Sequence, residues 1–146
     1  GVPVRHLTKS GCQNAQDCQK SSCPIFENKQ GDCYRLQCFK TTDLLKKELD
    51  LNIPTIVAFH SRLGKIPWIK PYLDEELERI APSYQGKNIT VACPSFTADC
   101  LETLEEIGDE AAQTWHDLTG GRLNLAPCVN TDASFIECLA DICRQS

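Results

Sequence analysis

Hydrophobic and polar positions divide the chain into two parts. Residues 7 to 33 are polar and follow neither a helical nor a strand period. From Thr41 onward, short apolar runs alternate with segments that have helical spacing. This alternation predicts an α/β fold, with a parallel sheet flanked by helices.

Three short apolar runs are typical of strands buried on both faces of a sheet. Pro or a polar residue follows each run. The predicted strands are Pro54–Phe59, Asn88–Cys93 and Leu123–Ala126.

Four segments carry the spacing of helices that bury one apolar face. Thr42 and Asp43 can cap the first helix, and Gly120 and Gly121 end the third. The predicted helices run from Thr42 to about Leu49, from Leu73 to Ile80, from Asp99 to about Leu118, and from Ser134 to Cys143.

In open α/β sheets, ligands bind beyond the carboxyl ends of the strands. Three segments follow the predicted strands and are therefore candidate parts of a site: His60–Arg62, Cys93–Phe96 and Pro127–Asn130. His60 and Arg62 can be structural, or they can face a crevice where Arg binds an anionic group. Trp68 is either a core residue or one wall of a pocket. We assign no role to His116.

Charge and hydropathy exclude some classes of protein. The net charge is −5, and residues 51–146 contain 7 Lys and Arg against 14 Asp and Glu. This excess of acid disfavours binding to nucleic acid, which requires a basic face. No apolar run has the length of a membrane span. The N-terminal residues do not resemble a signal peptide, so we expect a reducing, cytoplasmic compartment.

An acidic segment opens the third predicted helix. Asp99, Glu102 and Glu106 are spaced at i, i+3 and i+7, which places them on one helix face. They can simply complement the helix dipole. Alternatively, they form a carboxylate ladder that accepts protons or passes on a hard cation.

Cysteine is unusually frequent, with 10 residues in the chain of 146. Half of them lie close together, at positions 12, 18, 23, 33 and 38, without a Cys-x2-Cys pair. This spacing leaves three alternatives: an iron–sulfur cluster, structural zinc, or unligated thiols. We expect Cys93 and Cys138, outside this group, to be buried as small apolar residues.

Four motifs resemble the ferrochelatase family. The run from Pro94 to Glu106 (PSFTADCLETLEE) resembles the signature near the C-terminus of the family, and His60 to Trp68 (HSRLGKIPW) resembles its QSRxGxxPW segment. Tyr34 to Thr42 (YRLQCFKTT) resembles the start of a family helix. Gly1 to Pro3 resembles the end of the S-x-H-G-x-P motif. The motifs span nearly the whole chain in the family's order.

The resemblance implies an enzyme, a lyase that inserts Fe²⁺ into a porphyrin in haem biosynthesis. The family fold has two similar α/β lobes, and residues 1–146 resemble the C-terminal, Rossmann-like chelatase lobe, with 7–38 as a Cys-rich internal segment. In the family pattern the metal-handling His immediately precedes Gly1. We therefore expect the chain to be inactive without that His and the N-terminal lobe, its expected partner.

The resemblance also implies roles for individual residues. Glu102 matches the family's catalytic glutamate, which acts in metal delivery or in removing pyrrole protons, and Asp99 and Glu106 match acidic positions nearby. Cys100 replaces a His of many members, which weakens a proton relay at that position. The residues that match the substrate cleft are Trp68, Ser61, Arg62 and His60, the last at a position where Gln is common.

Some ferrochelatases bind a [2Fe–2S] cluster, and some bacterial members have a Cys-rich segment like this one. The resemblance therefore implies a cluster on Cys12, Cys18, Cys23 and Cys33, with Cys38 as the alternative to Cys33. It also allows peripheral membrane contact in the full enzyme.

Two rival functions remain at this point. One is a non-catalytic iron–sulfur or zinc-binding module, and a brown colour would separate the iron–sulfur form from the zinc form. The other is a related chelatase for another metal, such as a cobaltochelatase. The motif from Cys93 to Glu106 favours iron.

Overall fold

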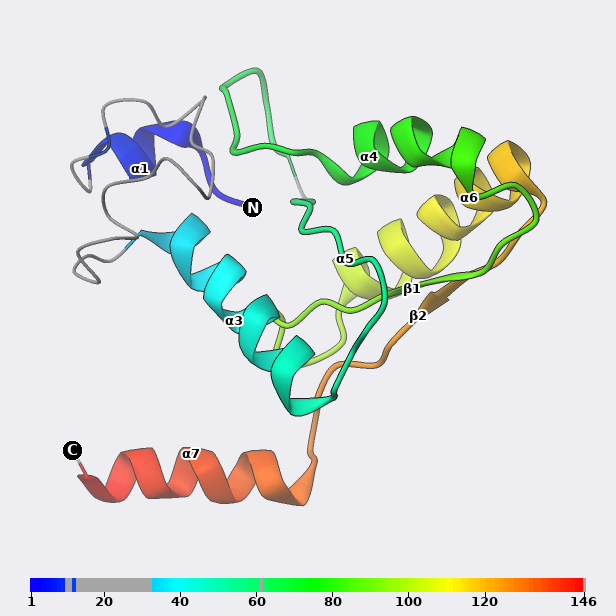
Figure 1. Cartoon of the computed structure of the whole chain (residues 1–146). Helices are drawn as coiled ribbons and strands as arrows, with labels where there is room; N and C mark the ends of the chain where they lie inside the picture. Colours follow the sequence, from blue (N-terminus) through cyan, green and yellow to red (C-terminus); the bar gives the residue numbers. More distant parts are fainter. Residues whose placement is uncertain (10–11, 13–32, 61, 146) are drawn as a thin grey trace. The chain divides into compact units, whose positions relative to one another are not determined.

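The computed structural model describes residues 1–9, 12, 33–60 and 62–145 of the chain (Figure 1). It consists of two compact units, Gly1–Leu77 and Glu78–Ser146, which are described here one at a time.

The first unit is built around a small apolar core. Helices α1 (Val4–Lys9) and α3 (Tyr34–Glu48) contribute Leu7 and Leu36, and the segment that follows contributes Phe59 and Ile69. Cys33, at the start of α3, belongs to the same core and is 4% exposed. The helix α4 (Leu73–Ile80) begins in this unit, as its spacing predicts.

Backbone hydrogen bonds attach the first residues of the chain to a distant loop. The amide of Val4 donates to the Pro67 carbonyl at 2.9 Å, and the amide of Ile69 donates to the Val2 carbonyl at 3.1 Å. These bonds flank an antiparallel bridge between Pro3 and Trp68. Two segments that the sequence analysis singled out separately are thus paired.

The prediction of a strand at Pro54–Phe59 is wrong: the described residues form no strand there. Only Phe59 pairs, in a single parallel bridge with Tyr72, and Ile53 and Ile56 are exposed. A strand requires a neighbour that satisfies its backbone groups. The described residues provide such a neighbour at Phe59 alone.

Helix α3 begins eight residues earlier than predicted, at Tyr34 rather than at Thr42. The hydroxyls of Thr41 and Thr42 do not cap its start. They donate to the carbonyls of Gln37 and Cys38 one turn earlier, at 2.9 and 3.0 Å. Threonine makes both kinds of bond, so its presence alone does not locate a helix start.

The second unit contains the parallel sheet and confirms the predicted fold class. Strand β1 (Ile89–Val91) pairs with β2 (Leu123–Leu125) in parallel, with Ile89 opposite Leu123 and Val91 opposite Leu125. Both strands lie within the predicted runs. The short 3₁₀ helix η2 (Ala81–Ser83) follows α4.

The predicted long helix forms, but it is not regular throughout. It consists of α5 (Leu101–Leu104), a π-helical turn η3 (Glu106–Ala111) and α6 (Ala112–Thr119), which run beside the strands (Figure 1). In the π turn the amide of Glu110 donates to the carbonyl of Glu105 at 2.9 Å, five residues back. Gly120, with a φ of 71°, ends α6 as predicted.

Trp115 anchors α6 on the loop before β1. Its side chain is fully buried, and its indole nitrogen donates to the Lys87 carbonyl at 3.1 Å. Gly121 also lies against Lys87, so closely that a Cβ atom at position 121 would be 1.9 Å from the same carbonyl oxygen. The start of β1 therefore requires glycine at this position.

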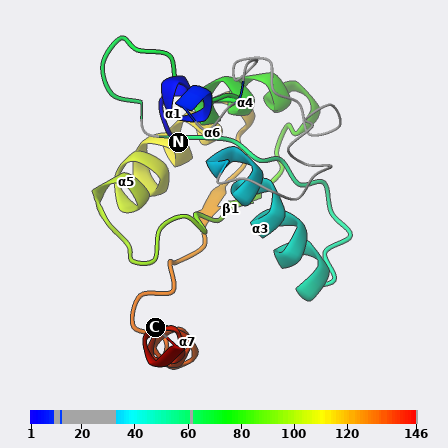
Figure 2. The same cartoon turned by 90° about the vertical axis from the view of Figure 1, so that its left-hand side faces the viewer.

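The last helix, α7 (Ala133–Gln145), forms where predicted, and Figure 2 shows it end-on. The Asp132 carboxylate accepts a hydrogen bond from the Ser134 amide at 2.9 Å, next to its first turn. None of its residues is buried, and its apolar residues Ile136, Leu139 and Ile142 are exposed. Cys138 is exposed as well, which corrects the expectation that it is buried.

Within the described residues, no helix has both the length and the apolar character required to cross a bilayer.

We expect Gly121→Ala to lower the free energy of unfolding by about 2 kcal/mol or more, because the added methyl group must displace the backbone at Lys87. Thermal or urea unfolding monitored by circular dichroism measures this change. Gly108→Ala is the matched control, because a Cβ atom there meets Leu125 at an ordinary 3.4 Å. Equal stabilities of the two variants would contradict the close approach at Gly121.

Candidate functional site

The acidic segment begins where both strands of the second unit end. Asp99 precedes α5 rather than forming part of it, because Cys100 has an extended backbone with φ −145° and ψ −177°. Glu102 lies in α5 and Glu106 opens the π turn, and both are half-buried. The predicted ladder on one helix face therefore begins at Glu102. Neighbouring acids at positions 105, 109 and 110 are exposed.

The Asp99 carboxylate is held by hydrogen bonds from the loop after β2. The Asn130 side-chain amide donates to Oδ2 at 2.8 Å, and the Cys128 backbone amide donates to Oδ1 at 3.2 Å. The Thr103 hydroxyl also lies 3.3 Å from Oδ1. These donors, led by Asn130, lower the pKa of Asp99 from its ordinary value. The group therefore stays ionised.

Three thiols lie near this carboxylate and near one another. They come from three segments: Cys93 after β1, Cys100 before α5, and Cys128 after β2. Burial, the hydrogen bond of its own thiol to Asp99 and the negative charge of Asp99 raise the pKa of Cys128 to about 11. Burial first, and then the charge of Asp99, raises the pKa of Cys93 as well.

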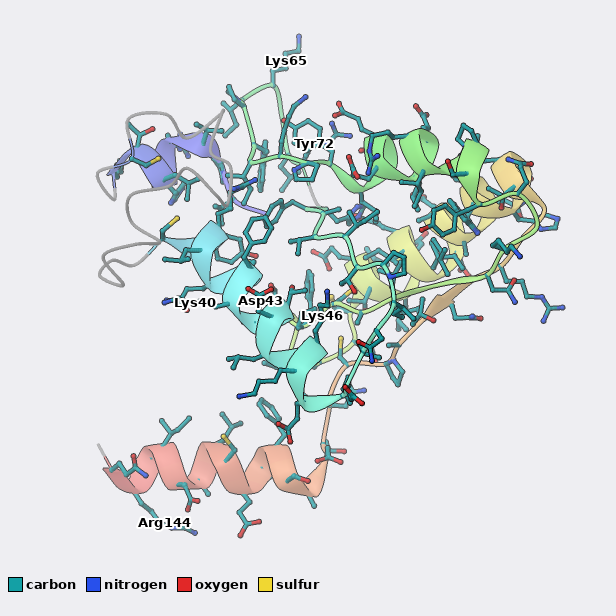
Figure 3. All side chains as sticks on the ribbon, in the orientation of Figure 1. Lys40, Asp43, Lys46, Lys65, Tyr72 and Arg144 are labelled. Atoms are coloured by element: carbon teal, nitrogen blue, oxygen red, sulfur yellow. The ribbon has the colours of Figure 1, made fainter. Side chains whose placement is uncertain are left out.

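The cleft residues expected from the motifs lie in the first unit. Trp68 is half-buried, and its indole nitrogen donates to the Leu63 carbonyl at 3.1 Å, which closes the loop between them. Arg62 forms an ion pair with Asp74, and its guanidinium lies 4.1 Å from the centre of the Tyr72 ring. Figure 3 labels Tyr72, and it shows Lys65 projecting from the loop between Leu63 and Trp68.

His60 is half-buried, and its carbonyl accepts a hydrogen bond from the Gly1 nitrogen at 2.8 Å. Ser61, the remaining cleft residue expected from the motifs, lies outside the described residues. A hollow of about 300 Å³ adjoins this region, and it is lined by Pro3, Val4, Arg5, Thr8, Ile66 and Pro67.

The Cys-rich segment is described only at its two ends. Cys12 and Cys38 pack against the core that contains Cys33, so three thiols meet one small cluster of side chains. Cys18 and Cys23 lie outside the described residues. Among the residues that the structure does describe, no group of three or more His, Cys, Asp or Glu is arranged to hold a metal ion.

Sequence reasoning missed two polar residues of these regions. Arg35 is 8% exposed; its Nε donates to the Lys70 carbonyl at 3.2 Å, while its Nη1 has no hydrogen-bond partner in the described part of the chain. Asn130 belongs to the segment Pro127–Asn130 after a predicted strand, but its sequence context assigns it no role. No local signal marks either residue, because their partners lie about thirty residues away or more.

His116 was given no role, and its ring nitrogen Nδ1 lies 3.3 Å from the Gly121 carbonyl. With Asp109, Glu110 and Arg122, it lines an open cleft of about 770 Å³ in the second unit.

The fold and the acidic segment define a class of protein: an α/β lobe that presents carboxylates at the ends of its parallel strands. The ferrochelatase family model matches residues 1–146. The chain therefore belongs to the ferrochelatase family.

Curated relatives agree with this assignment. A ferrochelatase of Legionella pneumophila (strain Lens) is 47% identical over 146 residues, which cover 99% of this chain and 43% of the relative. A ferrochelatase of Coxiella burnetii (strain RSA 493 / Nine Mile phase I) is 45% identical, over 100% of this chain and 41% of the relative. The chain thus spans less than half the length of the relatives it matches.

We expect Asp99→Asn to accelerate alkylation of Cys128 by iodoacetamide at pH 8. With a pKa of about 11, the Cys128 thiol is almost entirely protonated at that pH. Removal of the neighbouring negative charge lowers this pKa, and a decrease of one unit increases the reactive thiolate about tenfold. Peptide mass spectrometry over time measures the rate. Asp117→Asn, which alters an exposed acid, is the control. Equal rates of Cys128 alkylation in the wild type, Asp99→Asn and Asp117→Asn would contradict the interaction between Asp99 and Cys128.

Proposed function

We propose that the chain is the C-terminal lobe of a ferrochelatase, an enzyme that inserts Fe²⁺ into a porphyrin to make haem. The observation that carries this proposal is the half-buried Glu102 on a helix that begins at the carboxyl ends of β1 and β2. Ligand sites of α/β sheets lie at this end. The relatives from Legionella pneumophila and Coxiella burnetii, both ferrochelatases, support the same reaction.

The reaction requires a base at the porphyrin. Two pyrrole N–H protons must leave as the divalent cation enters, so a group with a carboxylate's affinity for protons and hard cations suits both events. Glu102 takes this role. Glu106, four residues later and also half-buried, receives the proton or passes on the Fe²⁺ substrate.

Trp68, Arg62, Ser61 and His60 bind the porphyrin in this proposal. Trp68 presents a planar apolar ring, and its loop is fastened both by its own indole nitrogen and by the pairing with Pro3. Arg62 supplies a positive charge for an anionic substituent, although its ion pair with Asp74 already stabilises it. The rest of the enzyme completes the cleft and is the chain's partner.

We also propose that a [2Fe–2S] cluster binds through Cys12, Cys18, Cys23 and either Cys33 or Cys38, in a reducing compartment such as the cytoplasm. The described residues fit an anionic cluster with thiolate ligands. Cys33 lies at the N-terminus of α3, where no acid occupies the first turn and no side chain caps the helix. Cys12 and Cys38 contact the same core as Cys33.

The buried Arg35 provides a second reason for this fit. Its Nη1 is buried without a partner among the described residues, two positions after Cys33. A buried donor atom of a cation is costly to leave without an acceptor, and a nearby negative group would offset that cost. When bound, the cluster supplies metal–thiolate bonds that tie the polar segment to this core.

We expect Glu102→Gln in the full-length enzyme to lower kcat by about two to four decades, because the change keeps the shape of the side chain and removes its basicity. A stopped or continuous assay of iron insertion into porphyrin measures this effect. Glu105→Gln is the matched control: it alters an exposed acid three residues further along, and should leave kcat within about threefold of wild type. A Glu102→Gln enzyme that also stays within threefold refutes the assignment.

For the cluster, we expect full-length protein purified without oxygen to be brown and to contain iron and acid-labile sulfide in equal amounts. Cys12→Ser, Cys18→Ser or Cys23→Ser should each remove the visible absorption, because each deletes a ligand. Cys33→Ser and Cys38→Ser decide which residue is the fourth ligand.

Cys93→Ser and Cys138→Ser are the controls, since both thiols lie outside the segment, and they should keep the colour. Colourless protein without iron or sulfide under these conditions would refute the cluster.

A further inference from the structure

We infer that Asp99 and Asn130 form a clamp that positions Glu102, and that Asp99 does not itself accept the substrate proton. This inference deepens the proposed function and rests on it, because it concerns the placement of the proposed base.

The clamp joins two loops in both directions. The Asn130 amide nitrogen Nδ2 donates to Asp99 Oδ2 at 2.8 Å, while the Asp99 backbone amide donates to Asn130 Oδ1 at 2.9 Å. Each residue is therefore both donor and acceptor toward the other, across 31 positions of sequence. A reciprocal pair of this kind allows little relative movement of the two loops.

Further bonds brace the Asn130 side of the clamp. The Asn130 backbone amide donates to the Thr97 carbonyl at 2.9 Å, and Nδ2 also donates to the Cys128 carbonyl at 2.9 Å. Asn130 has a φ of 50°, in the left-handed region that costs free energy for residues other than glycine. The surrounding hydrogen bonds offset this cost and hold the loop in one conformation.

On the other side, the clamp connects directly to the turn that carries Glu102. Thr103 is fully buried, and its hydroxyl accepts the Cys100 amide at 2.9 Å. The proton of this hydroxyl is shared between two acceptors, the Cys100 carbonyl at 3.1 Å and Asp99 Oδ1 at 3.3 Å. Asp99 and Thr103 thus fix the backbone on both sides of Glu102. A shift of the loop after β2 would therefore move the carboxylate of Glu102.

The same contacts make Asp99 a poor base. Both of its carboxylate oxygens already accept hydrogen bonds within the fold. These bonds hold the pKa of Asp99 below its ordinary value, so its affinity for a proton is low. Glu102, half-buried in α5, remains the candidate for the chemistry.

A comparable bond at the opposite ends of the strands provides a control. Asn88, just before β1, accepts the Arg122 amide at 2.9 Å through Oδ1 and so ties β1 to the start of β2. This bond also stabilises the sheet, but it lies at the amino ends of the strands, away from Glu102.

The first test compares Asn130→Gly with Asn88→Gly in the full-length enzyme. Glycine suits the φ of 50° at position 130, so the variant should fold while losing the side chain of the clamp. We expect Asn130→Gly to lower kcat for iron insertion about 10- to 100-fold, with the KM for porphyrin within about threefold of wild type. Asn88→Gly should lower the Tm and leave kcat within about threefold.

The second test exchanges the two side chains. In D99N alone, the side chain at position 99 must lose either the hydrogen bond from Asn130 Nδ2 or the one from the Cys128 amide, because an amide cannot accept at both of its ends. In D99N/N130D, the carboxylate introduced at position 130 accepts both the new side-chain amide and the backbone amide of position 99, but the bond that Asn130 Nδ2 donates to the Cys128 carbonyl is lost. We expect D99N to lose about 10- to 100-fold in kcat and the double variant to recover part of this loss, with a kcat at least about threefold above that of D99N.

The outcomes separate the clamp from the proposed function. A double variant no more active than D99N overturns the inference, because Asp99 would then act chemically, and so does Asn130→Gly with wild-type kcat. Loss of kcat in Asn88→Gly equal to that in Asn130→Gly also overturns it, since a general loss of stability would explain both. A wild-type enzyme without iron insertion, or Glu102→Gln with wild-type kcat, refutes the proposed function itself.

Discussion

The close approach of backbone to backbone at Lys87 is the constraint on which the second unit depends. The Lys87 carbonyl accepts the indole N–H of Trp115 and lies against Gly121, so one peptide group connects the start of β1, the middle of α6 and the turn before β2. With this contact in place, Ile89 meets Leu123 and the two parallel strands share one register. The carboxyl ends of both strands then coincide, which brings the loops of Asp99 and Asn130 together.

The residues at these strand ends differ in what their surroundings allow them to do. The oxygens of the Asp99 carboxylate accept hydrogen bonds from Asn130, Cys128 and Thr103. Such a carboxylate holds backbone in place and is poorly suited to exchanging protons. In the proposed function, two acidic residues of one motif therefore have different roles: Asp99 holds the geometry, and Glu102 performs the chemistry. In the first unit, the buried Arg35 is likewise held by its surroundings: its Nε donates to the Lys70 carbonyl, and its guanidinium lies over the Phe39 ring.

The hydrophobic periodicity of the sequence correctly predicts most helices and both paired strands. The spacing of Leu73, Leu77 and Ile80 corresponds to α4, and the runs that contain β1 and β2 were recognised by their short apolar character. The same reasoning failed at Pro54–Phe59, because an apolar run becomes a strand only beside a partner. It also placed the start of α3 too late, since Thr41 and Thr42 bond backwards within the helix.

The sequence by itself determined the alternation of helix and strand, the end of α6 at Gly120, and the family to which the motif from Pro94 to Glu106 points. Each of these is encoded within about a dozen neighbouring residues, where hydrophobic period and chain stereochemistry act. The tertiary structure alone decided that Asp99 pairs with Asn130, that Trp115 anchors on Lys87, and that Arg35 is buried. Those contacts join positions about thirty residues apart, and they arise only when the strand register has brought the segments within hydrogen-bonding distance.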